Sequence, residues 1–467
     1  MYVEQLYTGC LAEAAYYIES NGEAAIIDPL RETSPYTELA NSRGAKIKYI
    51  FETHFHADFV SGHVDLAKKT GATIVYGPTA TAGYELHVGS DNEEFHIGNV
   101  KIKLLHTPGH TPESSTYLLV DEKGKDHAIF SGDTLFLGDV GRPDLAIKSD
   151  VSERDLACML YNSLRTKIMT LADDVIVYPG HGAGSACGKN MSSETVGNLG
   201  DQKKNNYALR ENMTQDEFCD EVLAGITAPP QYFPKNAMMN KQGYKSIDDV
   251  MESGMRALSL EEFESTKESA LILDTRNHLL FIKGFIPGSL SIGINGSFAV
   301  WVGALIQDLN QPIIVIADEG NEEEAVLRLA RVGYDNCIGY LDGGFATWEN
   351  AGKPSDKIES IHSKELQERV KSDNGIIVDV RKPGEYASEH VEDAVSYPLD
   401  YINNHLNDLD KDKANFIHCK SGYRSVIAAS ILKQNGYNNI VDVAGGFQAI
   451  SEYSGLPISE FVCPTTL

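Results

Sequence analysis

Short runs of β-branched and other apolar residues recur along the chain, separated by loops or by stretches with helical character. Apolar runs of this length, bounded by turn-forming residues, are typical of buried β-strands, and alternation with helices is typical of parallel sheets. We therefore predict a mixed α/β fold. The runs are IKYIFE (47–52), VKIKLL (100–105), HAIF (127–130) and DVIVYPGH (174–181), then ALILD (270–274), PIIVIA (312–317), GIIVD (375–379) and NFIHC (415–419).

The second half of the chain contains an internal repeat. DTR at 274–276 matches DVR at 379–381 with an offset of 105 residues, and GGF at 343–345 matches GGF at 445–447 with an offset of 102. A nearly constant offset across a unit of common domain size indicates two tandem domains. Each copy alternates strand-like and helical stretches, so each is predicted to be an α/β domain with a parallel sheet.

The repeat and a proline-rich connection together predict three domains. We place them at residues 1–240, 250–355 and 356–467. The connecting stretch 226–244 has prolines at positions 229, 230 and 234, and we expect them to prevent regular helix there.

Composition and charge narrow the classes of function. Of 467 residues, 42% are hydrophobic and 23% charged, which suits a globular protein with a buried core. The net charge of -27 repels phosphate backbones and anionic lipids, so neither nucleic acid nor a membrane is expected as a partner. No apolar run is long enough to span a membrane, and the N-terminus does not resemble a secretory signal. Seven scattered cysteines fit a reducing compartment, so a cytoplasmic location is expected.

Four apolar runs in the first part each lead into a histidine or an aspartate. The motifs HFHAD, TPGH, SGD and PGH supply His54, His110, Asp133 and His181 in this order. The ends of neighbouring strands gather at one edge of a sheet, so these side chains are expected to meet. Imidazole and carboxylate ligands suit iron, zinc or manganese. Unrelated surface histidines are the alternative, but four strand-end motifs disfavour it.

These motifs, read as HFHAD, TPGHTPES, SGDTLF and PGHG, resemble the metallo-β-lactamase superfamily, which implies an αβ/βα sandwich. The superfamily pattern H-x-H-x-D-H ends in a histidine that serves a second metal in binuclear hydrolases. Here Phe59 occupies that position, and a phenyl ring cannot bind a metal.

Longer stretches, TPGHTPESSTYL and SGDTLFLGDVGRPD, are similar to the persulfide dioxygenase branch. The resemblance implies one Fe(II) per chain, held by His54, His110 and Asp133, with positions left for substrate sulfur and O₂. His56 and Asp58 then lie outside the ligand set. Arg142 in the GRPD segment is a candidate to bind a carboxylate of a thiol cofactor, and a structural turn is the equal alternative.

A second candidate site lies in the last domain, where a strand, a loop and a helix follow one another in NFIHCKSGYRSV. Cys419 opens this loop, and Lys420 and Arg424 flank it. Loop N–H groups, the helix N-terminus and the two cations favour a thiolate, which makes Cys419 a candidate nucleophile. The alternative is a buried cysteine at the end of a strand.

The loop and the repeated DVR and GGF motifs resemble the rhodanese family of sulfurtransferases. The resemblance implies that Cys419 carries a transferable sulfur as Cys–S–SH and that Lys420 and Arg424 contact the substrate. The middle repeat has Asp318 at the cysteine position and three glutamates where the cations would stand. A carboxylate cannot carry sulfane sulfur, so the middle domain is predicted to be an inactive rhodanese.

Cys187 lies in a glycine-rich segment directly after His181. Its thiol is a candidate to relay persulfide sulfur between the two sites, or it is inert.

The combined prediction is a fused enzyme of sulfide detoxification. The iron domain would oxidise a low-molecular-weight thiol persulfide with O₂ to sulfite, and the rhodanese would move sulfane sulfur and form thiosulfate. The carrier thiol is not determined, and a homo-oligomer is expected from the family. One alternative is a zinc thioesterase of the glyoxalase II type fused to a sulfurtransferase. Another is a sulfur carrier or sensor with a degenerate metal domain.

Overall fold

The computed structural model describes residues 1–146, 151–189, 191–226 and 228–463. They divide into two compact units, Met1–Asp248 with Ala330–Gly333, and Asp249–Leu329 with Tyr334–Leu467. Among the described residues, none of the helices is both long and apolar enough to cross a membrane.

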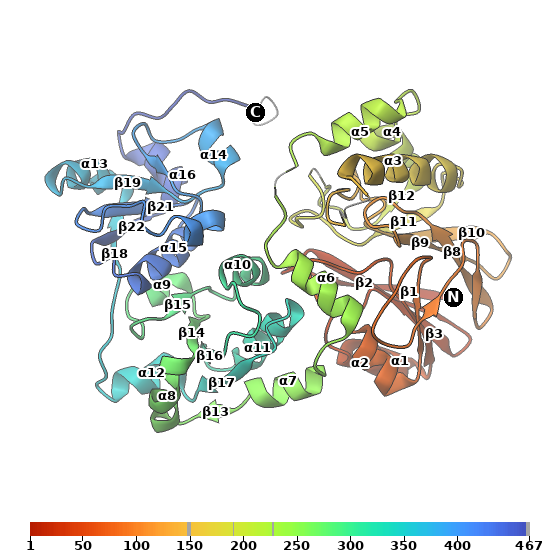
Figure 1. Ribbon diagram of the computed structural model, residues 1–467, viewed down its shortest axis with the longest axis horizontal. Helices are drawn as coiled ribbons and strands as arrows, with labels where there is room; N and C mark the ends of the chain where they lie inside the picture. Colours follow the sequence, from red (N-terminus) through yellow and green to blue (C-terminus); the bar gives the residue numbers. More distant parts are fainter. Residues whose placement is uncertain (147–150, 190, 227, 464–467) are drawn as a thin grey trace. The chain divides into compact units, whose positions relative to one another are not determined.

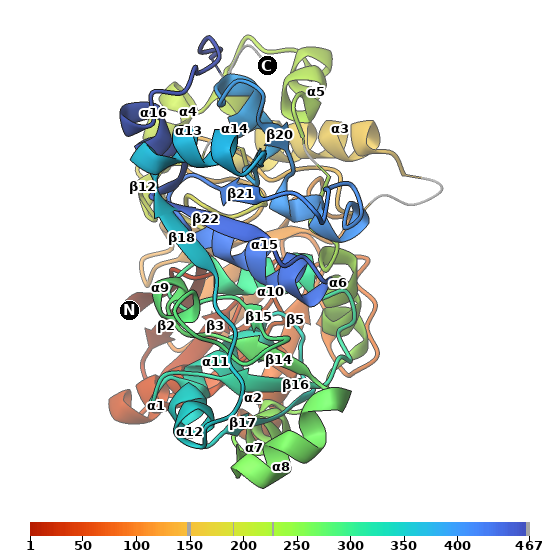
Figure 2. The ribbon, with the colours of Figure 1, turned by 90° about the vertical axis from the view of Figure 1, so that its left-hand side faces the viewer.

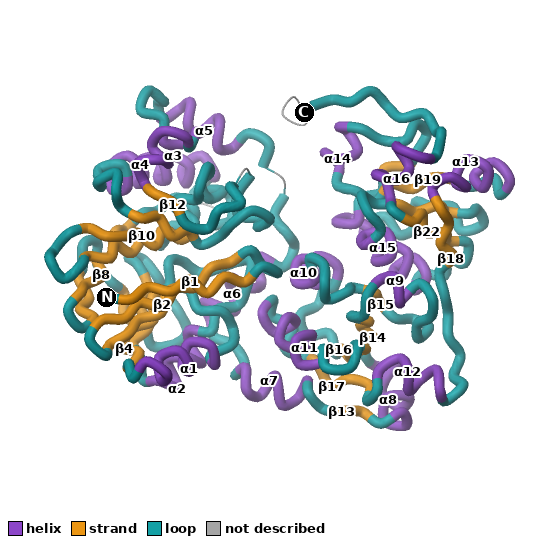
Figure 3. The backbone as a smooth tube through the Cα atoms, turned by 180° about the vertical axis from the view of Figure 1, so that it is seen from behind, coloured by secondary structure: helices purple, strands orange, loops and turns teal. Residues whose placement is uncertain are grey.

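The first unit is a sandwich of two β-sheets with helices on both outer faces (Figures 1 and 3). Its central core lies between the sheets and is built from apolar side chains of both. Helices α1 (Ser34–Arg43) and α2 (His63–Thr70) cover the outer face of one sheet, and α3 (Glu153–Ser163) and α5 (Gln215–Leu223) cover the other. This is the αβ/βα sandwich that the sequence motifs imply.

The sheets of this unit are six-stranded within the described ranges. Across the first sheet the strands are β1 (Tyr2–Thr8), β2 (Glu13–Ser20), β3 (Glu23–Ile27), β4 (Lys46–Phe51), β5 (Thr73–Tyr76) and β6 (His87–Val88). Across the second they are β12 (Gly197–Asn198), β11 (Ile176–Pro179), β10 (Asp126–Gly132), β9 (Ser115–Val120), β8 (Val100–His106) and β7 (Glu94–Ile97).

Local sequence explains where helices begin. Both α3 and α5 start with a capping box, formed by Ser152 with Asp155 and by Thr214 with Glu217, which satisfies the first free N–H groups. The remaining helical elements of the unit are a π-helical turn (Leu164–Ile168), α4 (Leu199–Asn205), a 3₁₀ turn (Tyr207–Leu209) and α6 (Phe233–Gln242). Helix α7 (Ile247–Gly254) begins in this unit and continues into the second.

The expected interruption of helix by the prolines of 226–244 is wrong for the second part of that stretch. Helix α6 begins at Phe233, with Pro234 in its first turn. A proline is tolerated there because an N–H in the first turn has no partner within the helix.

The second unit contains two five-stranded sheets among its described residues, and all their strand pairs are parallel. The α/β prediction with parallel sheets is confirmed. The first sheet has β13 (Ala257–Leu258), β17 (Cys337–Leu341), β16 (Ile313–Ile316), β14 (Leu271–Asp274) and β15 (Leu290–Ser291). The second has β18 (Glu359–His362), β22 (Ile440–Ala444), β21 (Asn415–His418), β19 (Ile376–Asp379) and β20 (Val395–Ser396).

The helices of the two repeats are α8 (Leu260–Thr266), α9 (His278–Phe281), α10 (Phe298–Leu305), α11 (Glu322–Arg331) and α12 (Gly344–Asn350), then α13 (Ser363–Ser372), α14 (Pro383–Ser388), α15 (Tyr423–Gln434) and α16 (Gly446–Tyr453), with 3₁₀ turns at Lys267–Ser269 and Leu399–Asn404. Among the described residues, the helices of the two repeats correspond except at one place, where α10 follows β15 in the first repeat and a 3₁₀ turn follows β20 in the second.

The repeated DVR and GGF motifs form one structural device. Arg381 pairs with Asp379 through Nη2 and Oδ2 at 2.6 Å, and its guanidinium lies 3.9 Å from the centre of the Phe447 ring. Arg276 makes the same contacts in the first repeat, with Asp274 at 2.6 Å and the Phe345 ring at 4.3 Å. A buried charge must be paired, so this arrangement ties the end of one strand to the start of the last helix.

Candidate functional site

Loops that follow the strands of the first unit bring three side chains of different origin together. His54 follows β4, His110 follows β8 and Asp133 follows β10. One potential ligand atom from each of the three lies within 4.8 Å of the others, and all three residues are buried. His110 Nε2 lies 3.5 Å from Asp133 Oδ2. The strand-end positions predicted from sequence therefore meet at one edge.

Hydrogen bonds fix which nitrogen of each histidine faces this cluster. His110 Nδ1 donates to the carbonyl oxygen of Arg142 at 2.8 Å, and His181 Nδ1 donates to that of Ala12 at 3.2 Å. His54 Nδ1 donates to Thr53 Oγ1 at 3.0 Å, because the Thr53 hydroxyl donates its own proton to an aspartate. Each Nε2 therefore keeps its lone pair for the cluster, the usual arrangement of metal-binding histidines.

The chemistry of the cluster fits a cation. Neither carboxylate oxygen of Asp133 accepts a hydrogen bond from a described N–H or O–H group, although both are buried. Burial, followed by the neighbouring histidines, lowers the pKa of His54 well below its usual value. A neutral imidazole and an unsatisfied buried carboxylate are the forms that bind a metal ion.

His56, the second histidine of the HFHAD motif, does not join this set. Its Nε2 lies 3.1 Å from Asp28 Oδ1 and 3.4 Å from Glu52 Oε2. Burial acts to lower the pKa of His56, but the two carboxylates outweigh it and raise the pKa well above the usual value. His56 is therefore engaged by two carboxylates, and Asp28, Glu52 and His56 form a further group of potential metal ligands beside the first.

Three further side chains form a separate group in the same unit. Asp58, His181 and Cys187 each offer one ligand atom within 4.8 Å of the others. His181 Nε2 lies 3.4 Å from Asp58 Oδ2 and 3.5 Å from Asp133 Oδ1, so the two groups adjoin.

Phe59 is fully buried, and its ring packs against His56 with centroids 4.4 Å apart.

Arg142 is held by protein groups on all sides. Its Nε and Nη2 donate to Asp144 at 2.6 and 2.7 Å, and Nη1 donates to the Ala186 carbonyl at 3.3 Å. Its backbone N–H donates to the carbonyl of Cys187 at 3.0 Å. Since its carbonyl accepts from His110, Arg142 links the His110 loop to the Cys187 loop. Substrate binding by Arg142 stays a prediction.

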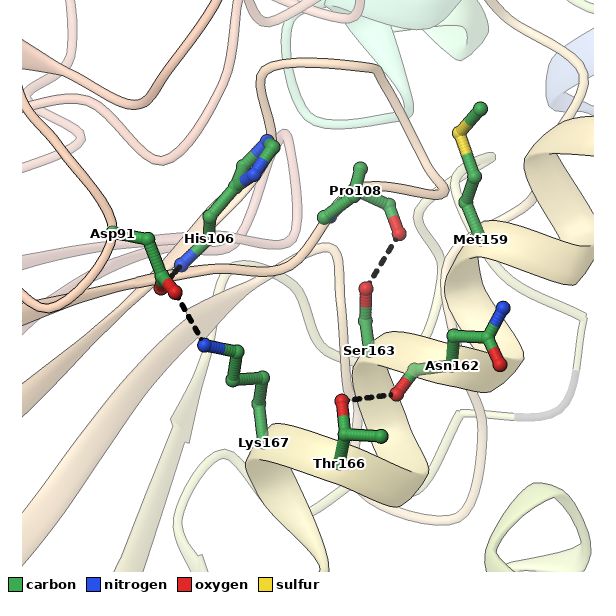
Figure 4. Close-up of a pocket in the computed structure, with 8 residues that line it drawn as sticks. All are labelled: Asp91, His106, Pro108, Met159, Asn162, Ser163, Thr166 and Lys167. Atoms are coloured by element: carbon green, nitrogen blue, oxygen red, sulfur yellow. Dashed lines mark hydrogen bonds and ion pairs between the residues drawn. The ribbon is translucent and has the colours of Figure 1, made fainter.

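A pocket of about 270 Å³ lies beside Pro108, two residues before His110 (Figure 4). Its polar groups pair with one another: Lys167 with Asp91 at 2.5 Å, and Ser163 with the Pro108 carbonyl at 2.7 Å. None of the three clustered ligands lines it, so it is not the metal cluster itself.

In the second unit, Cys419 stands directly after β21 and is 1% exposed. The N–H of Gly422 donates to Cys419 Sγ at 3.1 Å, and α15 begins at the next residue. A backbone hydrogen bond joins the loop to the GGF motif, because the Phe447 N–H donates to the Cys419 carbonyl at 2.7 Å. Gly446 makes this possible: a Cβ there would lie 2.4 Å from the Cys419 oxygen. The GGF motif thus supports the cysteine loop.

The two cations of the loop differ in surroundings. Lys420 is exposed. Arg424 donates from Nη1 and Nη2 to the two carboxylate oxygens of Glu385, at 2.6 and 2.9 Å. This bidentate pair orients the guanidinium and offsets part of its charge. Sequence reasoning overlooked Glu385, although its position in the KPGE segment after DVR was a usable signal.

The middle repeat touches the cysteine loop within the second unit. Helix α15 lies against β15 (Figure 2), where the Ser291 N–H donates to Ser430 Oγ at 3.0 Å. Tyr423, inside the loop, donates its hydroxyl proton to the Gly293 carbonyl at 2.8 Å. The His278 ring meets the Tyr423 ring edge-on, with centroids 5.9 Å apart. None of these contacts was visible in the sequence.

Comparison with known proteins places both halves in families. Residues 8–181 match the metallo-beta-lactamase superfamily, and residues 259–351 and 362–453 each match the rhodanese-like domain. A solved structure described as a metallo-beta-lactamase from Staphylococcus aureus is 33% identical, with a TM-score of 0.64, over 73% of this chain and 98% of that one. The chain belongs to the metallo-β-lactamase superfamily. It carries two rhodanese-like domains after the metallo-β-lactamase domain.

Relatives of this chain within the superfamily are named for different activities. A probable hydroxyacylglutathione hydrolase of Schizosaccharomyces pombe is 28% identical over 45% of this chain and 82% of its own length. The human mitochondrial persulfide dioxygenase ETHE1 is 33% identical over 34% of this chain. The match covers 59% of that human protein. The chain is thus an enzyme of the group that contains metallo-hydrolases and persulfide dioxygenases.

Sequence reasoning about this superfamily member missed the residues that position its ligands. Asp28 accepts from the Thr53 N–H at 2.7 Å and from the Thr53 hydroxyl at 2.8 Å, which orients His54. Glu52 accepts from the Ser61 hydroxyl at 2.6 Å and faces His56. Asp28 and Glu52 each directly follow an apolar strand, which was a usable signal in the sequence. Nothing in the sequence indicated which residues these two carboxylates contact.

Proposed function

We propose that the chain is an Fe(II)-dependent persulfide dioxygenase fused to an active rhodanese. The main support for this proposal is that His54, His110 and Asp133 converge at one place. His56 does not join them, because it faces Asp28 and Glu52. Two imidazoles and one carboxylate with open positions form the facial ligand set of non-haem iron oxygenases. The human persulfide dioxygenase relative supports the same assignment.

The proposed reaction converts RS–SH, O₂ and H₂O into RSH and sulfite. His54, His110 and Asp133 would hold the iron, which when bound supplies a site for the substrate sulfur and for O₂. The protein fixes the geometry: Thr53, Arg142 and Ala12 hold the outer nitrogens of His54, His110 and His181. Because His54, His110 and Asp133 are buried, the site would keep bulk water away from the reacting sulfur.

The second reaction in the proposal is sulfur transfer at Cys419. As Cys419–S–SH, the residue would give its outer sulfur to sulfite, so that thiosulfate forms and the Cys419 thiolate is released. The Gly422 N–H and the N-terminus of α15 stabilise that thiolate. The middle repeat would serve as a support for the loop, since it holds Tyr423.

The test is anaerobic loading of the full chain with Fe(II), followed by addition of glutathione persulfide and air-saturated buffer. We expect one iron per chain, oxygen uptake, and sulfite and thiosulfate that together equal the oxygen consumed. Iron-loaded protein that consumes no oxygen would instead support a sulfur carrier.

A binuclear hydrolase is the second candidate, and one observation favours it. Asp58, His181 and Cys187 converge beside the first cluster, which offers three ligands for a second metal despite Phe59. Metal analysis of the purified chain separates the two: two zincs per chain and hydrolysis of S-lactoylglutathione indicate the hydrolase. In that case Cys187→Ser would remove one of the two metals. In a dioxygenase Cys187 would line the substrate site, as a contact or a relay for sulfur, and the iron content would stay at one.

A further inference from the structure

Two cysteines outside both sites lie within contact distance in the first unit. Cys158 is on α3 and Cys219 is on α5, 61 residues later, and their Sγ atoms are 3.2 Å apart. This separation is only ~1 Å longer than a disulfide bond. Both residues are free thiols in the structure.

Helices α3 and α5 contact each other one turn before and one turn after the two cysteines. One turn before Cys158, Arg154 donates to Asp220 and Asp216 on α5, at 2.7 and 2.8 Å. One turn after it, the Tyr161 ring meets the Phe218 ring edge-on, with centroids 5.5 Å apart. The sulfur atoms therefore meet because the helices are held in this register, and no rearrangement of the backbone elements is needed to join them.

The two thiols differ in access. Cys158 is partly exposed, whereas Cys219 has no exposed surface. Burial, followed by the hydrogen bond with Cys158 and its charge, raises the pKa of Cys219 to about 12, and Arg154 acts in the opposite direction. A small reagent in solution would thus meet Cys158 first.

We propose that Cys158 and Cys219 are a dithiol that reacts with low-molecular-weight disulfides and closes reversibly to an intramolecular disulfide. The Cys158 thiolate attacks RS–SR, so a mixed disulfide forms and one RS⁻ leaves. Cys219 then gives its proton to solvent and attacks the Cys158 sulfur, which releases the second RS⁻. Two electrons pass from the cysteines to RS–SR, which is reduced to two RSH.

The second step is helped by the first. Conversion of Cys158 into a mixed disulfide removes the hydrogen bond from its thiol that helps to raise the pKa of Cys219, while Arg154 remains. The closed bond would tie α3 to α5. Helix α3 packs behind the metal-cluster loop, because a Cβ at Gly109 would lie 2.4 Å from Leu160 Cα.

The experiment is a non-reducing tryptic map of the full chain after incubation with oxidised glutathione at neutral pH. Trypsin places the two cysteines in separate peptides, 155–165 and 211–235. We expect one new species with the summed mass of these peptides less two hydrogens, which disappears with dithiothreitol. The closed form should also melt at a higher temperature than the reduced form.

Two variants make the result decisive. Cys158→Ser should abolish the cross-linked peptide, and Cys337→Ser, which alters a buried cysteine of the other unit, should leave it unchanged. The proposal is overturned if glutathione remains attached to Cys158 without cross-linking. It is equally overturned if the cross-link forms only after denaturation. Iron-free protein should behave identically, so this outcome is independent of the proposed dioxygenase activity.

Discussion

The hydroxyl of Tyr423, inside the cysteine loop, donates a hydrogen bond to the backbone carbonyl of Gly293 in the middle repeat, at 2.8 Å. The ring is also enclosed there, since a Cβ at Gly296 would lie 2.2 Å from Tyr423 Cζ. The loop that holds Cys419 is therefore supported by a domain that has no cysteine of its own at the equivalent position.

Replacement of Gly296 by alanine should displace Tyr423 and with it the cysteine loop, because the added methyl group overlaps the ring. We expect transfer of sulfur from thiosulfate to cyanide to fall by about tenfold or more, which corresponds to about 1.4 kcal/mol or more of lost positioning. Oxygen uptake by the metallo-β-lactamase domain should not change. Gly384→Ala is the matched control, since a Cβ there meets nothing within 4 Å. Equal activity of the two variants would show that the contact with the middle repeat is not needed.

Cys419→Ser should abolish sulfur transfer, because a serine hydroxyl cannot carry sulfane sulfur, and should spare sulfite formation. Products are measured by chromatography of thiosulfate and sulfite after reaction with glutathione persulfide. Cys337→Ser, at another buried cysteine, should leave both products unchanged. Loss of oxygen consumption in Cys419→Ser would mean that the two sites are obligatorily coupled.

Asp133→Asn should greatly reduce iron binding, since the amide lacks the negative charge of the carboxylate. We expect a loss of about tenfold or more in iron content after reconstitution and dialysis, measured by elemental analysis, with loss of oxygen uptake in parallel. Removal of iron from the unaltered chain by a chelator should have the same effect on oxygen uptake, and re-addition of Fe(II) should restore it. His96→Ala, at an exposed histidine, serves as the control. Full iron occupancy in Asp133→Asn would exclude this carboxylate as a ligand.

Arg142→Ala distinguishes two roles of this residue. If its contacts with Asp144 and the Ala186 carbonyl position the His110 loop, iron affinity should fall by about 10- to 100-fold. If the guanidinium instead binds the carboxylate of a thiol substrate, KM for the persulfide should rise while iron affinity stays the same. We expect the first result, and an iron titration followed by oxygen-uptake kinetics measures both quantities.

The buried carboxyl of Asp442 predicts a specific dependence of stability on pH. Burial raises its pKa above the usual value, against the hydrogen bonds from Ser425 and Ser360. A folded-state pKa above the unfolded one means that ionised Asp442 costs stability at pH 7, and that this cost disappears as the pH falls through the raised pKa. Asp442→Asn should therefore melt at the same or a higher temperature at pH 7, with a smaller difference near pH 4. Trp301 and Trp348, both in the second unit, report the transition. A lower melting temperature at pH 7 would show that the hydrogen bonds to the carboxylate outweigh its burial.

The strand-like runs, the repeat and the resemblance to two families were readable from the sequence alone, whereas the order of the strands within each sheet came from the structure. Strand-end residues such as His54 and Cys419 could be predicted as site candidates because the carboxyl ends of strands gather at one edge, whatever the details of packing. The prediction that the middle repeat is inactive rests on residue types alone, since Asp318 cannot carry sulfur as a thiol does.

What only the tertiary structure decided is which neighbour each candidate meets. Motif spacing could not tell that His56 faces Asp28 and Glu52, because those partners come from other positions in the chain. Likewise Arg142, a candidate ligand for substrate in the sequence, has its guanidinium on Asp144. The contact of Cys158 with Cys219 depends on how two helices pack, 61 residues apart. Local propensity and periodicity determine where helices and strands begin and end. Contacts between residues far apart in the sequence depend instead on how the chain packs, because a buried charge or thiol meets the side chains that packing places beside it.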